Sequence, residues 1–80
     1  MRTVVMPQLG QSVDEWRIVR WHKRVGERVR VDEVLFDLET EAGATEIPSL
    51  DDGVITEIDV MEGQSAKVGT ILARIGDTGD

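Results

Sequence analysis

The sequence predicts an all-β domain made of two similar halves. Apolar residues alternate with polar ones or come in short runs that Gly, Pro and Asp interrupt, and both patterns are typical of strands. No segment keeps apolar residues at the i, i+3, i+4, i+7 spacing of a helix over three turns. We expect eight short strands, at residues 3–6, 15–21, 28–31, 34–39, 45–48, 53–58, 65–68 and 71–75.

An internal repeat supports the two-halves arrangement, because residues 26–38 align with residues 63–75 without a gap. Six aligned pairs keep a glycine or an apolar side chain, namely Gly26 and Gly63, Val29 and Ala66, Val31 and Val68, Val34 and Ile71, Leu35 and Leu72, and Leu38 and Ile75. Two copies exclude a solenoid, which needs three or more. The repeat therefore predicts a quasi-twofold fold.

Turn residues separate the expected strands in order along the chain. Pro7 follows the first strand and Pro48 ends the fifth. Because proline has no N–H to donate to a sheet, we expect both at a strand end or bulge, at matching places in the two halves. Gly26 and Gly63 precede the third and seventh strands, where glycine permits the positive φ of a tight turn.

The second expected strand contains both tryptophans, Trp16 and Trp21. Successive residues of a regular strand point to opposite faces, so at most one of the two is expected to face the core. We expect Trp21 to be packed in the structure. Trp16 either fills the core or forms a new contact surface, since an exposed tryptophan is a common interface anchor.

Length and charge narrow the class of protein. Eighty residues form one small domain, which buries about 60% of its unfolded surface. We expect a monomeric domain at residues 1–76, with residues 77–80 beginning a linker or tail. Sixteen acidic residues against nine basic ones give a net charge of −7, which opposes binding to nucleic acid or to an anionic membrane. This charge either favours a protein partner with a basic face or only keeps a small domain soluble.

Cysteine and long apolar segments are both absent from the sequence. Nothing therefore argues for an oxidising compartment or for membrane insertion. We expect the cytoplasm as the location, or the mitochondrial or plastid matrix if the source is a eukaryote.

Four stretches match a known family in the right order: MPQLGQSV at residues 6–13, VRWHKRVGERV at 19–29, DEVL at 32–35 and GTILARI at 69–75. With these stretches the chain resembles the lipoyl domains of the acyltransferase components of 2-oxo acid dehydrogenase complexes, and more loosely the biotinyl domains of carboxylases. The resemblance implies a flattened β-barrel or sandwich of two four-stranded antiparallel sheets related by a quasi-twofold axis. It also implies a modified lysine at the tip of the hairpin between the fourth and fifth strands.

The expected hairpin, LETEAGATEIP at residues 38–48, resembles the family pattern E-T-D-K-x-x-x-E-I-P. The matching residues are Glu39, Thr40, Glu46, Ile47 and Pro48. Ala42 stands where the resemblance places the lysine, and its methyl group offers no amine for the amide bond to lipoic acid. We therefore expect no lipoate unless that lysine is restored or another lysine is used.

Other positions also depart from the family pattern. Glu41 and Gly43 differ from it beside the missing lysine, and Trp16 stands where lipoyl domains usually have glycine. A laboratory change of the lysine would alter one position only, so these departures favour natural divergence. The biotinyl likeness is weaker, because that family surrounds its lysine with methionines.

The leading hypothesis is a lipoyl-like docking module that cannot be lipoylated and that positions enzymes of a 2-oxo acid dehydrogenase-like or related acyl-transfer system. Its expected partners are thiamine-dependent enzymes or acyltransferases. The candidate docking residues are Glu39, Glu41, Ala42, Gly43, Glu46 and Trp16. In a simpler interpretation, Gly43 is the third residue of an ordinary four-residue turn and the flanking carboxylates are only solvated.

A second hypothesis keeps the carrier role, with the lysine mutated or the modification placed elsewhere. Only Lys23 and Lys67 could then accept an acyl group, and neither lies in the expected hairpin. A third class, a small enzyme, has little support. His22 is the only histidine and is expected in a surface loop, so no catalytic residue and no metal site is predicted.

Overall fold

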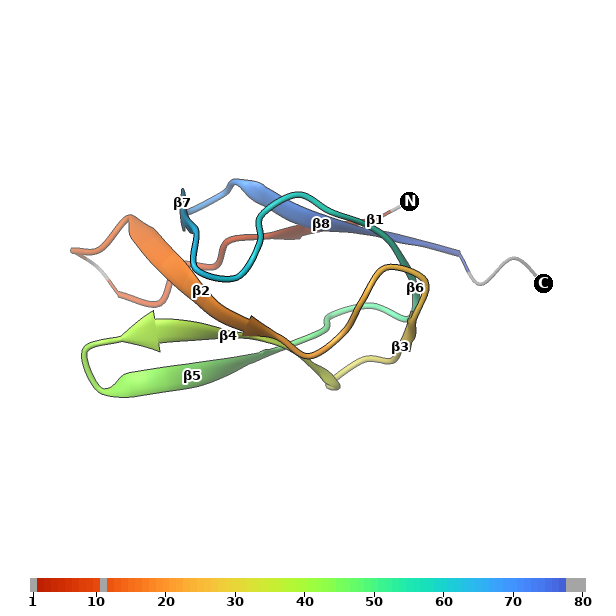
Figure 1. Cartoon of the computed structure of the whole chain (residues 1–80), viewed down its shortest axis with the longest axis horizontal. Helices are drawn as coiled ribbons and strands as arrows, with labels where there is room; N and C mark the ends of the chain where they lie inside the picture. The colour runs from red at the N-terminus through yellow and green to blue at the C-terminus, as the bar shows by residue number, and fades with distance from the viewer. Residues whose placement is uncertain (1, 11, 78–80) are drawn as a thin grey trace.

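The computed structural model describes residues 2–10 and 12–77 and contains all eight expected strands (Figure 1). Several ends differ from the expectation by one or two residues, because hydrogen-bonded pairing sets them. The strands are β1 (Arg2–Val5), β2 (Glu15–Trp21), β3 (Arg28–Val29), β4 (Val34–Thr40), β5 (Gly43–Pro48), β6 (Gly53–Ile58), β7 (Ser65–Lys67) and β8 (Ile71–Gly76).

The strands form two four-stranded sheets, in the orders β1-β8-β6-β3 and β5-β4-β2-β7. All pairings are antiparallel. Exchanging each strand for the one four places along the chain converts the first order into the second. The predicted fold class, with its quasi-twofold symmetry, is therefore confirmed.

Equivalent turns in the two halves make equivalent hydrogen bonds. The Gly26 N–H donates to the Ile55 carbonyl and the Gly63 N–H to the Ile18 carbonyl, each over 2.7 Å. Both glycines have positive φ, 95° and 87°, as the turn pattern predicted. Each bond thus extends the pairing of the short strand that follows the turn, β3 with β6 and β7 with β2, at the same place in its half of the fold.

The two prolines do not occupy matching places. Met6 exchanges two backbone hydrogen bonds with the turn before β8, and Ser49 does the same with the turn before β4. Met6 and Ser49 are therefore the equivalent residues, so Pro7 lies just after this point in one half and Pro48 just before it in the other. Pro48 still ends an edge strand, and Pro7 follows the other edge strand that faces it, where a missing N–H costs no ladder bond.

The core lies between the sheets and consists of aliphatic side chains around one phenylalanine. Its buried hydrophobic residues are Met6, Ile18, Val29, Leu35, Phe36, Leu38, Ile55, Ala66, Leu72, Ala73 and Ile75. Trp21 packs against Phe36 with 4.8 Å between ring centroids, and its Nε1–H donates to the Val60 carbonyl over 2.8 Å. The packed role expected for Trp21 is thus confirmed.

Strand β2 is not regular, and this changes the place of its tryptophans. The register with β4 shifts between Ile18 and Arg20, so Val19 is an extra residue and is 41% exposed. A bulge of this kind resets the alternation of side chains. Trp16 and Trp21 therefore both pack against the core, and the expectation that at most one of them faces it is wrong.

The chain beyond β8 is described only as far as Asp77, which is exposed. Residues 78–80 of the expected linker lie outside the described residues, so the boundary at residue 76 stays a prediction. No described segment forms a helix of the length and apolar character that would cross a membrane.

Candidate functional site

The β4–β5 hairpin ends in a two-residue turn at one end of the molecule (Figure 1). Thr40 pairs with Gly43 across the strands, which leaves Glu41 and Ala42 as the turn. The Thr40 hydroxyl donates to the Gly43 carbonyl over 2.6 Å and accepts the Ala42 N–H over 3.2 Å. The hydroxyl thus holds the turn closed, while Glu41, Ala42 and Gly43 are all exposed.

The simpler interpretation expected Gly43 to be the third residue of a four-residue turn. In the structure Gly43 instead begins β5 and pairs with Thr40. Its φ is 112°, which glycine adopts without a steric penalty. Apart from glycines, Asp32 is the only described residue with a positive φ. The φ of Ala42 is therefore negative, as is usual for L-amino acids. Position 42 can therefore carry any L-amino acid other than proline, which lacks the N–H that Thr40 accepts, without backbone strain.

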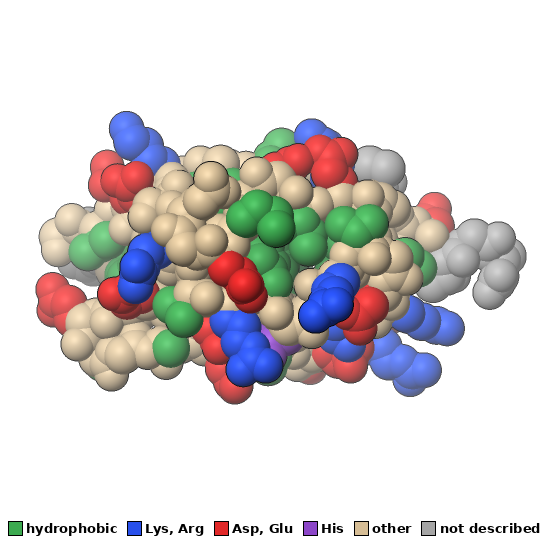
Figure 2. Space-filling view, in the orientation of Figure 1, with side chains coloured by type: hydrophobic (Ala, Val, Ile, Leu, Met, Phe, Trp, Pro, Cys, Tyr) green, Lys and Arg blue, Asp and Glu red, His purple; other side chains and the backbone are tan. Residues whose placement is uncertain are grey.

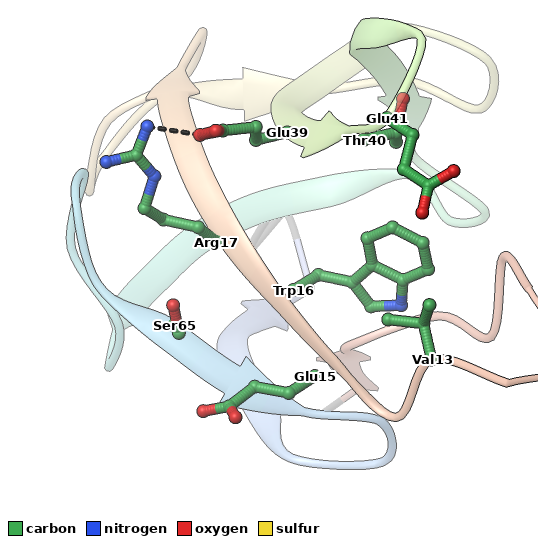
Figure 3. A pocket seen from close by; sticks show the side chains of 8 residues that line it. All are labelled: Val13, Glu15, Trp16, Arg17, Glu39, Thr40, Glu41 and Ser65. Carbon is green, nitrogen blue, oxygen red and sulfur yellow. Dashed lines mark hydrogen bonds and ion pairs between the residues drawn. The ribbon is translucent and has the colours of Figure 1, made fainter.

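The expected docking residues do not all lie on one surface. Trp16, Glu39 and Glu41 line one open pocket of about 510 Å³, together with Val13, Glu15, Arg17, Thr40 and Ser65. Figure 3 shows the Trp16 ring pointing into this pocket, with Glu41 on one side and Val13 on the other. Glu46 is exposed but does not line the pocket.

Strand pairing brings the parts of this site together. Arg17 lies opposite Glu39 in the β2–β4 register, and the two side chains form an ion pair (Figure 3). Glu15 lies opposite Lys67 in β7. Sequence reasoning missed Val13, Glu15, Arg17 and Ser65 as members of the site, because these residues meet Glu41 only through pairing of distant strands. It also left out Thr40, which directly precedes Glu41.

Trp16 combines a packed side with an accessible one. It is half-buried and contacts the core, yet its ring also lines the pocket. Its Nε1 is buried and has no hydrogen-bond partner among the described residues. Both roles expected for Trp16, core filling and contact surface, are thus physically available to the one side chain.

The two lysines lie away from the hairpin tip. The Lys23 Nζ is 3.4 Å from a carboxylate oxygen of Glu33, and the Lys23 side chain is only 19% exposed. Lys67 is exposed in the short strand β7. Neither amine is presented at the end of a two-residue turn.

His22 lies in the loop after β2, as expected, but it is partly buried. Its Nε2 is 2.9 Å from the Asp37 carboxylate, and the two side chains are 28% and 17% exposed. After the bulge in β2, Arg20 lies opposite Asp37. His22 is two residues further along the chain and so lies on the same face as Asp37. In the part of the chain that the structure describes, no group of three or more His, Cys, Asp or Glu residues is arranged to hold a metal ion.

Two carboxyl groups with shifted pKa values lie outside the pocket. The Arg30 N–H donates to Glu33 over 2.7 Å, and this bond, with the nearby charge of Lys23, lowers the pKa of Glu33. The neighbouring Asp59 carboxylate raises the pKa of Glu57, because it accepts a hydrogen bond from the protonated Glu57 and because its negative charge opposes the ionisation of Glu57. Both glutamates lie outside the pocket, so neither forms an acid–base pair beside the tip.

The comparisons with known proteins cover nearly the whole chain. The family described as "Biotin-requiring enzyme" (biotin–lipoyl) matches residues 2–75. Relatives include the dihydrolipoyllysine-residue acetyltransferase components of the pyruvate dehydrogenase complexes of Mycobacterium bovis and Corynebacterium glutamicum. They are 44% identical over 79 residues and 49% identical over 74 residues, which is 99% and 92% of this chain.

The chain spans only 14% and 11% of the length of these two relatives. A solved structure allows a comparison of matched length, namely the lipoyl domain of the 2-oxoglutarate dehydrogenase complex from Azotobacter vinelandii. It is 32% identical, with a TM-score of 0.77, and the match covers 96% of this chain and 98% of that domain. Fold and sequence thus agree over the same residues, and the chain belongs to the lipoyl domain family.

Proposed function

We propose that this chain is a lipoyl-type domain that carries no lipoate on its hairpin and acts as a docking module. The assembly that it serves is a 2-oxo acid dehydrogenase complex or a related acyl-transfer system. The observation that carries the proposal is the hairpin tip, which is closed and fully exposed but presents Glu41 and Ala42. The tip keeps the geometry of a presenting surface and lacks an amine to acylate.

The chemistry of attachment supports the absence of lipoate. An amide bond to lipoic acid needs a nucleophilic amine, and the methyl group of Ala42 cannot provide one. Lys23 is held by Glu33 and mostly covered, and Lys67 lies within a strand. Neither lysine reproduces an exposed hairpin tip that a ligase could admit into its active site.

The charge of the tip supports a partner with a basic face. In the view of Figure 2, acidic side chains lie around the hairpin end with basic ones among them, and further long basic side chains project towards the opposite end. Glu39 is neutralised by Arg17, which leaves Glu41 and Glu46 as exposed charges of the hairpin. The relatives' names place them in complexes with other enzymes, so thiamine-dependent and acyltransferase components are the first partners to test.

Charge reversal at the tip tests the docking role. The variant Glu41→Arg/Glu46→Arg is expected to bind the thiamine-dependent component of the source organism at least fivefold more weakly than the wild type, because it replaces attraction by repulsion. Arginine avoids introducing a new amine that could be acylated. Binding that is unchanged in the double variant would rule out the tip as the docking surface.

A second candidate function remains that of a swinging-arm carrier. The identity to two dihydrolipoyllysine-residue acetyltransferases, 44% and 49%, favours it. In this case the attached group must lie on Lys23 or Lys67. Peptide mapping of the protein from its own cells distinguishes the two functions, since an acylated peptide containing either lysine supports the carrier.

A further inference from the structure

We propose that the pocket beside the hairpin tip binds one arginine side chain of a protein partner. The pocket holds about 510 Å³ and combines an aromatic ring with carboxylates. The inference rests on the docking role proposed above for the identity of the partner. It names the group on the partner, a guanidinium, that the pocket recognises.

The aromatic wall of the pocket is the Trp16 ring. Trp16 is anchored by its contact with the core, and a Cβ added to Gly10 would lie 3.8 Å from the ring, so the loop before β2 also backs it. The ring is therefore a fixed platform, and tryptophan is the side chain that holds a cation over its face most strongly. The buried Nε1–H of Trp16 has no partner among the described residues, a cost that phenylalanine would not carry.

The carboxylates of the pocket are available for a cation from outside. Glu15 and Glu41 are exposed and take part in none of the ion pairs formed by the described residues. Glu39 is already bound to Arg17 across the strands, which shows that a guanidinium is accommodated at this edge of the pocket. Figure 3 draws Glu41 on the same side of β2 as the Trp16 ring and Glu15 on the other side, so a second cation beside Trp16 would meet the free charge of Glu41.

The geometry favours arginine over lysine. A guanidinium is planar and can stack on an indole ring while its N–H groups point sideways to carboxylates. Those N–H groups can bind a carboxylate in bidentate fashion. An ammonium group is a compact charge that cannot meet the ring and the carboxylates in the same way.

The indole N–H signals provide a direct test, because the chain has only two tryptophans. We would titrate the ¹⁵N-labelled chain at low salt with Nα-acetylarginine amide, and in parallel with Nα-acetyllysine amide. The Trp16 Nε1–H signal is expected to shift saturably with the arginine probe and about threefold more weakly with the lysine probe. The Trp21 signal serves as an internal control, since that N–H is bound to the Val60 carbonyl.

Matched variants separate the pocket from the general charge of the domain. Glu41→Gln is expected to weaken arginine binding about fivefold, and Trp16→Leu, followed through the Glu41 amide signal, about tenfold. Glu46→Gln makes the same charge change on the same hairpin outside the pocket and is expected to change binding less than twofold. Trp16→Leu keeps an apolar side chain against the core, and its Trp21 signal reports whether the fold is retained.

Three outcomes would overturn the inference: no saturable shift of the Trp16 signal, equal weakening by Glu41→Gln and Glu46→Gln, or equal affinity for both probes. These outcomes are separate from the failure of the proposed function. A lipoylated protein would refute the docking role and leave the arginine site as measured. A pocket that binds no arginine would refute this inference and leave the question of lipoylation unchanged.

Discussion

Ala42 occupies the second position of the hairpin turn, fully exposed and with an ordinary backbone. The variant Ala42→Lys is therefore expected to change the free energy of unfolding by less than about 0.5 kcal/mol. It supplies the missing amine on an unaltered hairpin, so a lipoyl ligase with lipoate is expected to modify it. Intact mass after the ligase reaction measures the result.

The wild-type chain is the matched control for this variant, since it contains Lys23 and Lys67 but no lysine at the tip. It is expected to keep its unmodified mass in the same reaction. Modification of the wild type would contradict the account. Failure to modify Ala42→Lys would show that the neighbouring Glu41 and Gly43 have removed a surface that the ligase reads.

Gly53, the first residue of β6, is required by close packing. A Cβ at this position would lie 2.3 Å from the Gly76 carbonyl oxygen and 2.5 Å from the Ile75 Cγ2. Gly53→Ala is therefore expected to lower the free energy of unfolding by about 2–3 kcal/mol, as overpacking does. Urea denaturation measures the loss.

Gly63 is the control for Gly53, because its φ is also positive, at 87°, but a Cβ would meet nothing within 4 Å. Gly63→Ala is expected to lower the free energy of unfolding by about 1 kcal/mol, the usual penalty for a left-handed backbone. Equal losses in the two variants would show that backbone conformation decides the effect and that the contact with Gly76 does not.

Single residues at the tip could be placed from the sequence only approximately. The matches at Glu39 and Glu46 located the hairpin, and Ala42 was correctly placed in its turn. Gly43 was assigned to the turn and belongs to β5, because a strand begins where cross-strand pairing begins. Local composition does not determine that point.

At the scale of the element, β2 provides a comparison of two tryptophans in one strand. The Trp21 N–H is bound to the Val60 carbonyl over 2.8 Å, whereas the Trp16 N–H has no partner among the described residues. Trp21→Phe is expected to lower the free energy of unfolding by about 1–2 kcal/mol, and Trp16→Phe by less than about 0.5 kcal/mol. A larger loss for Trp16→Phe in thermal or urea unfolding would contradict the assignment of these contacts.

The turn between β3 and β4 contains a carboxylate that links stability to pH. The Arg30 N–H and Lys23 lower the pKa of Glu33 from its usual value of 4.5. A carboxyl group with a lowered pKa in the folded state stabilises the fold above the unfolded pKa, and this contribution is lost as pH falls through the folded pKa. Wild-type stability is therefore expected to fall more steeply between about pH 5 and pH 3 than that of Glu33→Gln.

Denaturant titrations at several pH values test this expectation. Glutamine can still accept the Arg30 N–H, so Glu33→Gln removes the titration and keeps the shape of the turn. Parallel pH profiles of the two proteins would contradict the assigned role of Glu33.

The elements themselves were largely predictable, since alternating patterns and turn glycines located all eight strands. The bulge in β2 was not, because Val19 is as apolar as the buried Ile18 and no local signal marks it as the extra residue. Its effect reached further than one position. It turned Trp21 and Trp16 to the same side and carried His22 onto Asp37.

At the scale of the whole molecule, the repeat predicted the quasi-twofold fold because the buried positions recur in both halves. Leu35 and Leu72 are both buried, as are Leu38 and Ile75. The pocket could not be predicted in the same way. It joins residues before and within β2 to the end of β4 and to Ser65, which lie far apart along the chain.

The charge distribution also belongs to the whole molecule. A net charge of −7 pointed to a basic partner but could not say where that partner binds. The arrangement of strands places the site at the hairpin end, where Trp16 and the exposed Glu41 line one pocket. Recognition of a partner there needs no covalent arm.

The intact mass of the protein that carries this chain, purified from its own cells, tests the central claim most directly. The account predicts the mass of the unmodified polypeptide, with no lipoyl or acyl group on the domain. A mass raised by a lipoyl or acyl increment, mapped to Lys23 or Lys67, would contradict the account and establish a carrier.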